Sequence, residues 1–124
     1  MTIAKNYANE RTAFGKPIGK FEGIQFKFAD MSAEIRAMEL MTYDTARMKA
    51  EGKRHTLEAA QTKLFSGVHC TQICLECQQV LGGNGYSKEY HVERFVRDAK
   101  LLEIGEGTNE ILRMLIGGTV LAQK

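Results

Sequence analysis

The sequence has little proline, little strand-like alternation and no long apolar run, and these absences exclude several classes of protein. Its 124 residues include a single proline, and few stretches alternate apolar and polar residues as a β-strand would. No apolar run approaches the ~20 residues that a membrane-spanning helix needs. The start, MTIAKNYANER, has neither the apolar core of a signal peptide nor the Arg-rich, acid-poor character of a transit peptide. These absences favour an intracellular helical protein of one domain, residues 1–124, with no membrane span.

Net charge and cysteine content exclude further classes. The formal net charge of +2 is too small to indicate a nucleic-acid partner or an anionic membrane. Cys70, Cys74 and Cys77 have the C-x-x-x-C-x-x-C spacing of an iron–sulfur motif, but they fall in a helical pattern at positions i, i+4 and i+7. We therefore expect three thiols on one helix face and no metal site. An odd number of cysteines also argues against a disulfide framework.

Apolar residues recur at steps of three and four along two long stretches, which predicts two amphipathic helices. The first stripe comprises Ile24, Phe28, Met31, Ile35, Met38 and Met41, and the second comprises Leu57, Ala60, Leu64, Val68, Thr71 and Leu75. We expect Thr56 to cap the second helix, which stops at Gly82–Gly83. A short helical piece over 3–12 and a last helix over 109–121, capped by Thr108, complete an all-α, up-and-down four-helix bundle.

The segment between Gly85 and Glu106 is rich in charge. In V-E-R-F-V-R-D-A, the side chains of Arg94, Arg97 and Asp98 are expected to form surface or interhelix ion pairs that hold a loop. Glu106 then stands between two glycines just before the last helix. A carboxylate on flexible backbone that a bulky ligand can approach closely is a candidate general base, although such a residue on its own is more often a solvated loop carboxylate.

Four motifs in order carry a resemblance to a known family. They are R-T-A-F-G-K-P-I, Q-V-L-G-G-N-G-Y, E-Y-H-V-E-R-F-V-R-D-A and E-G-T-N-E-I-L-R, which begin at Arg11, Gln79, Glu89 and Glu106. Together they resemble the C-terminal helical domain of acyl-CoA dehydrogenases, over nearly the whole chain. The resemblance implies an FAD-dependent oxidoreductase acting on the CH–CH group of acyl-CoA thioesters in fatty acid or amino acid catabolism. It also implies that the chain is a fragment lacking an N-terminal helical domain and a middle β-domain.

The same resemblance assigns roles to particular residues. Glu106 would remove the α-proton of the thioester, which argues against the isovaleryl and long-chain subgroups, and Gly107 would contact the substrate through its backbone. Cofactor contacts would come from two sets of residues. Those from the same subunit are Thr108, Asn109 and Glu110, and the set that reaches the FAD of a neighbouring subunit is Arg11, Glu22, Gln79, Val80, Leu81, Gly82 and Gly83. Phe14 would be a further cofactor contact.

The resemblance further implies an electron-transferring flavoprotein as partner, a homodimer or homotetramer, and a location in the bacterial cytoplasm or the mitochondrial matrix. At Glu22 the family usually has Gln, so the amide donor of that contact is lost here. The glycines at 82, 83 and 85 do not form a dinucleotide fingerprint, because they follow a helix rather than a strand. The alternative to the enzymatic interpretation is a helical module that only oligomerises or binds another protein.

Overall fold

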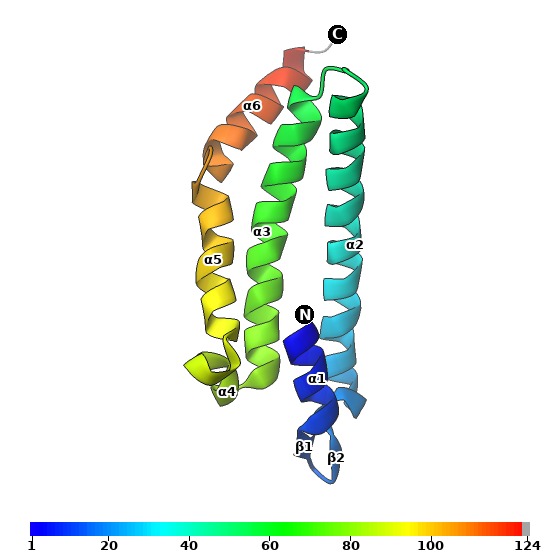
Figure 1. The fold of residues 1–124 in the computed structure, drawn as a ribbon, viewed down its shortest axis with the longest axis vertical. Helices are drawn as coiled ribbons and strands as arrows, with labels where there is room; N and C mark the ends of the chain where they lie inside the picture. Colours follow the sequence, from blue (N-terminus) through cyan, green and yellow to red (C-terminus); the bar gives the residue numbers. More distant parts are fainter. Residues whose placement is uncertain (123–124) are drawn as a thin grey trace.

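The computed structural model describes residues 1–122 and is built almost wholly from helices (Figure 1). The main helices, in chain order, are α1 (Thr2–Glu10), α2 (Glu22–Ala50), α3 (Thr56–Leu81), α5 (Val92–Ile104) and α6 (Asn109–Ala122). They are connected by the short helix α4 (Gly83–Tyr86), the 3-10 turns η1 (Ile18–Lys20) and η2 (Lys88–Tyr90), and the antiparallel two-residue strands β1 (Thr12–Ala13) and β2 (Lys16–Pro17). The predicted all-α class is confirmed.

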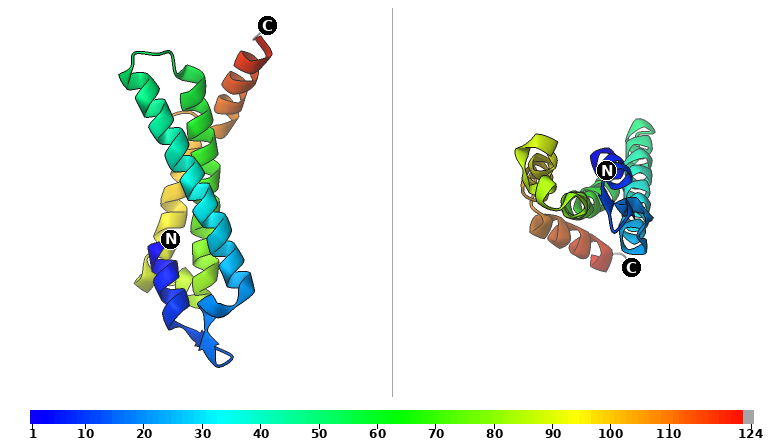
Figure 2. Two further views of the ribbon diagram at one scale, coloured as in Figure 1. Left: turned by 90° about the vertical axis from the view of Figure 1, so that its right-hand side faces the viewer. Right: turned by 90° about the horizontal axis from the view of Figure 1, so that it is seen from below.

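The helices of residues 1–122 form four segments, called legs here, that run alternately down and up the long axis (Figures 1 and 2). α1 runs down, α2 up and α3 down, and α5 and α6 follow each other up the far side of α3. The long helix α3 is the common neighbour, because α1, α2, α4, α5 and α6 all pack against it. The up-and-down four-helix arrangement is therefore confirmed, with one addition: the fourth leg is interrupted at residues 105–108, which is where Glu106 lies.

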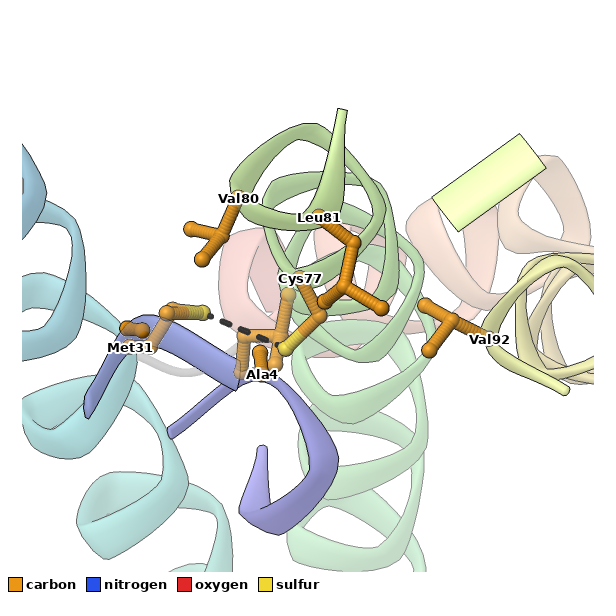
Figure 3. Close-up of a cluster of buried hydrophobic side chains, with 8 residues drawn as sticks. Ala4, Met31, Cys77, Val80, Leu81 and Val92 are labelled. Carbon is orange, nitrogen blue, oxygen red and sulfur yellow. Dashed lines mark hydrogen bonds between the residues drawn. The ribbon is translucent and has the colours of Figure 1, made fainter. Parts of the chain in front are cut away.

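The main cluster of buried side chains lies near the end of α3, where α1, α2 and the start of α5 meet (Figure 3). Met31 of α2 and Leu81 of α3 are its largest fully buried side chains. The Cys77 thiol donates a hydrogen bond to the Met31 sulfur at 3.6 Å. The first predicted apolar stripe is confirmed, because Met31 is buried and Ile24, Phe28, Ile35 and Met38 pack against the cluster.

The second predicted stripe is partly wrong. Val68 and Leu75 are 38% and 42% exposed, although both were placed on the apolar stripe of α3. The reason is that α3 is contacted on several sides, so its buried residues do not follow one face; they are Ala60, Gly67, Ile73, Cys77, Val80 and Leu81. Neither α3 nor any other helix within residues 1–122 is both long and apolar enough to cross a membrane.

The expected cap of α3 is also wrong. Thr56 is the first residue inside the helix, and His55 occupies the N-cap position without a side-chain hydrogen bond to the helix. The His55 ring instead lies 2.9 Å from the Lys53 carbonyl oxygen through Nδ1, within the loop. Glu58 does lie in the first turn of α3, where its charge is favourable to the helix dipole.

The charged segment after α4 is not a loop. Residues Val92–Ile104 form the thirteen-residue helix α5, with Val92 and Ala99 buried two turns apart. Its charges pair along the helix: Arg97 Nε lies 3.2 Å from Glu93 Oε2, and Arg94 Nε lies 3.9 Å from Asp98 Oδ2. Such pairs four residues apart support a helix rather than a loop, and the apolar residues between them supply the buried face.

Gly85 is the glycine at which an added Cβ would make the closest contact. A Cβ at Gly85 would lie 2.3 Å from the Gln78 carbonyl oxygen, whereas a Cβ at Gly83 would meet nothing within 4 Å. Gly85→Ala should therefore lower the free energy of unfolding by about 1–3 kcal/mol, because backbone of α3 or α4 has to move. Gly83→Ala, the matched control, should stay within about 0.5 kcal/mol of wild type. Urea unfolding of both variants measures the difference, and equal midpoints would contradict the tight α3–α4 contact.

Candidate functional site

The candidate site residues fall into two groups at different heights on the bundle (Figure 1). The hairpin, the start of α2 and the end of α3 carry the first group at one end of the molecule. The second group, Glu106 to Glu110, occupies the break between α5 and α6. Helix α5 lies between the groups, and its 13 residues span roughly 20 Å. The two groups therefore do not form a single small site within one chain.

Part of the first group, namely Arg11 and residues 79–83, lines a recess of about 460 Å³ at the end of α3. Its walls are Tyr7, Arg11, Ile18, Asn84 and the run Gln79–Gly83. Val80 and Leu81 are only 5% and 2% exposed and belong to the core, so these two residues offer little surface to a ligand. Gln79, Gly82 and Gly83 are exposed, and helix α3 ends there because Gly82 takes a φ of 58°.

Arg11 has a fixed backbone and a free side chain. Its N–H donates to the Tyr7 carbonyl at 2.8 Å, and its carbonyl accepts from the Ile18 N–H at 2.8 Å. The guanidinium is exposed and has no carboxylate partner among residues 1–122. A guanidinium held in this way beside exposed backbone can bind a pyrophosphate or another bidentate anion.

Phe14 lies at the tip of the β1–β2 hairpin. Phe14 and Gly15 have φ values of 50° and 79°, as a two-residue type I′ turn requires. A phenylalanine in this left-handed conformation is unusual, and its ring is 97% exposed with only an edge contact to Phe21 at 6.1 Å between centroids. Glu22 is exposed at the start of α2, and neither Phe14 nor Glu22 lines the recess.

Glu106 occupies the turn that interrupts the fourth leg. α5 ends when the Gly105 N–H donates to the Leu101 carbonyl at 2.8 Å, and Glu106 and Gly107 follow with φ values of 56° and 103°. A left-handed residue other than glycine costs on the order of 1 kcal/mol and marks candidate functional sites. The Glu106 side chain is exposed, and its carboxylate has no hydrogen-bond or ion-pair partner among the residues that the structure describes.

The predicted cap of α6 is confirmed. Thr108 Oγ1 accepts a hydrogen bond from the Ile111 N–H at 3.4 Å, and the Thr108 carbonyl accepts one from the Leu112 N–H at 3.0 Å. Helix α6 thus starts immediately after the turn, at Asn109.

Side chains that the sequence interpretation missed attach this turn to α3. Lys63 Nζ donates to the Gly107 carbonyl at 2.8 Å and to the Leu102 carbonyl at 3.2 Å. Gly67 lets α3 approach α5 and α6 closely: a Cβ at Gly67 would lie 3.2 Å from the Leu102 carbonyl oxygen and 3.5 Å from Asn109 Oδ1. The available signal was the position of Lys63 between Ala60 and Gly67, at helical spacing from two buried residues.

Asn109 and Glu103 connect the two helices across the turn. Asn109 is 4% exposed, and its Nδ2 donates to Glu103 Oε2 at 3.3 Å. The same carboxylate oxygen accepts from Lys100 Nζ at 3.0 Å. The Thr71 hydroxyl and then the Lys100 ammonium hold the pKa of Glu103 below its usual value of 4.5. Because the folded state favours the charged form, Glu103 stabilises the fold above about pH 4.5, and this contribution is lost as the pH falls through the lowered pKa.

The three cysteines lie on one face of α3, as predicted. Cys70, Cys74 and Cys77 line a largely apolar recess of about 400 Å³ between α1, α2, α3 and α5. Burial, followed by the neighbouring Cys70, raises the pKa of Cys74 to about 11. This thiol therefore stays protonated at neutral pH and is a poor nucleophile. Within residues 1–122, no group of three or more His, Cys, Asp or Glu side chains is placed to hold a metal ion.

The architecture is that of a helical domain which presents an unpartnered carboxylate at a break in its fourth leg and, at one end, a recess lined by the exposed Arg11. Residues 1–121 match the family model described as the C-terminal domain of acyl-CoA dehydrogenase, and the chain belongs to this family.

Known relatives agree in sequence and in fold. The chain is 50% identical over 115 residues to "Probable acyl-CoA dehydrogenase YngJ" of Bacillus subtilis, covering 93% of this chain and 30% of that protein. Butyryl-CoA dehydrogenase from Megasphaera elsdenii has a TM-score of 0.95 at 43% identity, over 97% of this chain and 31% of that one. The FAD complex of PigA has a TM-score of 0.92 at 26% identity, over 96% and 31%. The chain thus spans about 30% of the length of these relatives.

Glu103→Gln should lower stability at neutral pH and flatten its dependence on pH in the acid range, because the variant has no depressed carboxyl pKa to titrate. Urea unfolding between about pH 3 and pH 7 measures this. Glu110→Gln is the matched control, since the Glu110 side chain is 78% exposed and should leave the acid dependence unchanged. Identical pH profiles for wild type and Glu103→Gln would contradict a stabilising role for this carboxylate.

Proposed function

We propose that this chain works as the C-terminal domain of an FAD-dependent acyl-CoA dehydrogenase and supplies Glu106 as the catalytic base. The observation that carries the proposal is the turn at 105–108. There the Glu106 backbone has a left-handed conformation, its carboxylate is exposed and without a partner, and the next residue is bonded to Lys63 of α3. Glu106 takes the proton from the α-carbon of an acyl-CoA thioester, and a double bond forms between the α and β carbons. Bound FAD supplies the acceptor for the hydride that leaves the β-carbon.

The other atoms of the turn fit a bound substrate. The Gly107 carbonyl is already engaged by Lys63, whereas the Gly107 N–H donates to no protein group among residues 1–122. With φ at 103° and no Cβ, the Gly107 backbone is open to close approach. An acyl-CoA that enters beside Glu106 can therefore contact this backbone. The carboxylate becomes an effective base once the remainder of the enzyme and the ligand exclude water from it.

The residues after Glu106 contribute unequally to a cofactor. Asn109 is buried and its amide is bonded to Glu103, so it offers little surface to FAD in this chain. Thr108 and Glu110 lie at the N-terminus of α6, with the Glu110 side chain 78% exposed. These residues would bind the FAD of the same subunit.

The recess at the end of α3 fits the FAD of a neighbouring subunit. Arg11 would pair with its pyrophosphate, and the exposed backbone at Gly82 and Gly83 admits a large planar ligand. The exposed ring of Phe14 is suited to contact with a group from outside the chain. The separation of about 20 Å between recess and Glu106 supports two cofactor sites per dimer. At Glu22, the carboxylate would add a negative charge near this cofactor in place of the amide donor usual in the family.

The proposed function includes a substrate, a partner protein, an oligomeric state and a location in the cell. An acyl-CoA is the substrate, an electron-transferring flavoprotein reoxidises the flavin, and the enzyme is a homodimer or homotetramer in the cytoplasm of a bacterium or the mitochondrial matrix of a eukaryote. Exposed apolar side chains on α6, including Met114 at 73% and Leu121 at 88%, support association with other chains. The same exposed side chains favour the alternative function, a helical association module without catalysis.

Replacing Glu106 with Gln separates the two functions. The test enzyme is butyryl-CoA dehydrogenase of Megasphaera elsdenii with its C-terminal segment replaced by this chain, since the two folds agree with a TM-score of 0.95. Glu106→Gln should lower kcat at least about 10³-fold with FAD content and oligomeric state unchanged, because only the proton acceptor is lost. Glu89→Gln, an exposed glutamate in η2, is the control and should retain wild-type kcat. Retained turnover in Glu106→Gln would contradict the role of Glu106 as the base and favour the association module as the function of this chain.

The isolated 124-residue chain should bind FAD weakly and show no turnover, since it contains about 30% of the length of its relatives. Titration with FAD, followed by flavin fluorescence, measures binding. An assay with an acyl-CoA and an artificial electron acceptor measures turnover. Tight binding together with turnover would mean that the chain is sufficient as an enzyme.

A further inference from the structure

We propose that Lys63 is a positioning residue for Glu106, which it aims by fixing the backbone on both sides of the turn. This inference rests on the proposed function, in which Glu106 is the base. Lys63 lies on α3. Its ammonium bonds neither the first group of candidate residues, at the end of the bundle, nor the Glu106 carboxylate.

The two contacts of Lys63 bracket the base. Its ammonium donates to the Gly107 carbonyl, directly after Glu106, and to the Leu102 carbonyl, in the last turn of α5. The Leu102 carbonyl is among the last four of α5, which have no partner further along the helix. A cation at the C-terminal end of a helix is also favoured by the helix dipole. The Lys63 side chain therefore supplies a hydrogen-bond donor to a carbonyl at the end of α5 and connects that helix end to Gly107, the residue after Glu106.

The turn needs such an anchor because two successive residues, Glu106 and Gly107, have left-handed backbone conformations. The second of them is a glycine, which can rotate to other φ values at little cost. Without the bond to its carbonyl, Gly107 would be free to do so, and the direction of the Glu106 side chain would change with it. Misplacing a reacting group by about 1 Å can cost a factor of 10² in rate.

Lys63 leaves the carboxylate itself free. No ion pair joins Lys63 to any carboxylate within residues 1–122, and its ammonium is within bonding distance of two carbonyl oxygens. The charge is thus engaged by backbone dipoles, and the proton acceptor keeps its lone pairs for the substrate. Other contacts hold these helices independently: α5 and α6 both pack against α3, where Gly67 allows the close approach of Leu102, and Asn109 of α6 bonds Glu103 of α5. Loss of Lys63 should therefore loosen the turn without detaching α5 or α6.

The kinetic test uses the same chimera with Megasphaera elsdenii butyryl-CoA dehydrogenase. Lys63→Met removes the donors and keeps most of the aliphatic length, and it should lower kcat about 10- to 100-fold with KM and FAD content within about threefold of wild type. Lys63→Arg, which can still donate to both carbonyls, should recover part of this loss. Lys100→Met is the matched control, because it breaks an ion pair with Glu103 near the same end of α5 without touching the turn; its kcat should stay within about twofold of wild type.

A second measurement does not depend on turnover. In the 124-residue chain, cleavage by a glutamate-specific protease at the Glu106–Gly107 bond reports opening of the turn. Lys63→Met should raise the rate at this bond about tenfold or more, relative to cleavage after the exposed Glu39, and Lys100→Met should not. If Lys63→Met does not fold, Lys63→Gln, which keeps one amide donor, takes its place in both measurements.

The outcomes are distinct. Wild-type kcat in Lys63→Met, or a uniform rise in cleavage at all sites, would overturn the positioning role while Glu106→Gln is inactive. Full activity of Glu106→Gln would instead overturn the proposed function on which the inference rests. A fall in kcat with unchanged KM, partial recovery in Lys63→Arg and faster cleavage confined to Glu106 would establish it.

Discussion

The close approach of the α5–α6 turn to the middle of α3 is the contact on which the rest of this structure depends. It is possible because Gly67 has no side chain, so that the Leu102 carbonyl and the Asn109 amide reach the α3 backbone. Glycine within a helix costs about 1 kcal/mol relative to alanine, and the packing here offsets that cost. From the same face of α3, Lys63 reaches the two carbonyls on either side of Glu106. Packing and polar contacts thus act together at one level of the bundle.

This arrangement explains why the fourth leg of the bundle is not a continuous helix. A straight helix through residues 105–108 would have carried the Glu106 side chain at a position set only by helix geometry. The break gives that residue a left-handed backbone on the outer surface while both flanking helices stay attached to α3. Local strain is tolerated because Lys63, Asn109 and Glu103 hold the surrounding backbone.

The distance between the two groups of candidate residues has a consequence for assembly. The recess near Arg11 and the turn at Glu106 are separated by the length of α5, so they are two distinct surfaces of one chain. Each group is open to solvent in the single chain and presents side chains without partners, such as the 97% exposed Phe14. Under the proposed function, other domains and a second subunit would complete both groups as binding sites.

The sequence by itself determined the helical class, the extent of the long helices, the end of α3 at Gly82 and the cap at Thr108. These features depend on local periodicity and on residues next to them in the chain. The ordered motifs also identified the family, which the match over residues 1–121 confirmed. Which residues of α3 are buried depended on neighbours far away in the sequence. The helix Val92–Ile104 did have local signals, namely ion pairs four residues apart and an apolar face, and the sequence interpretation treated that segment as a loop. Only the tertiary structure decided that Lys63 meets Gly107, because a bond between residues 44 positions apart leaves no periodic trace.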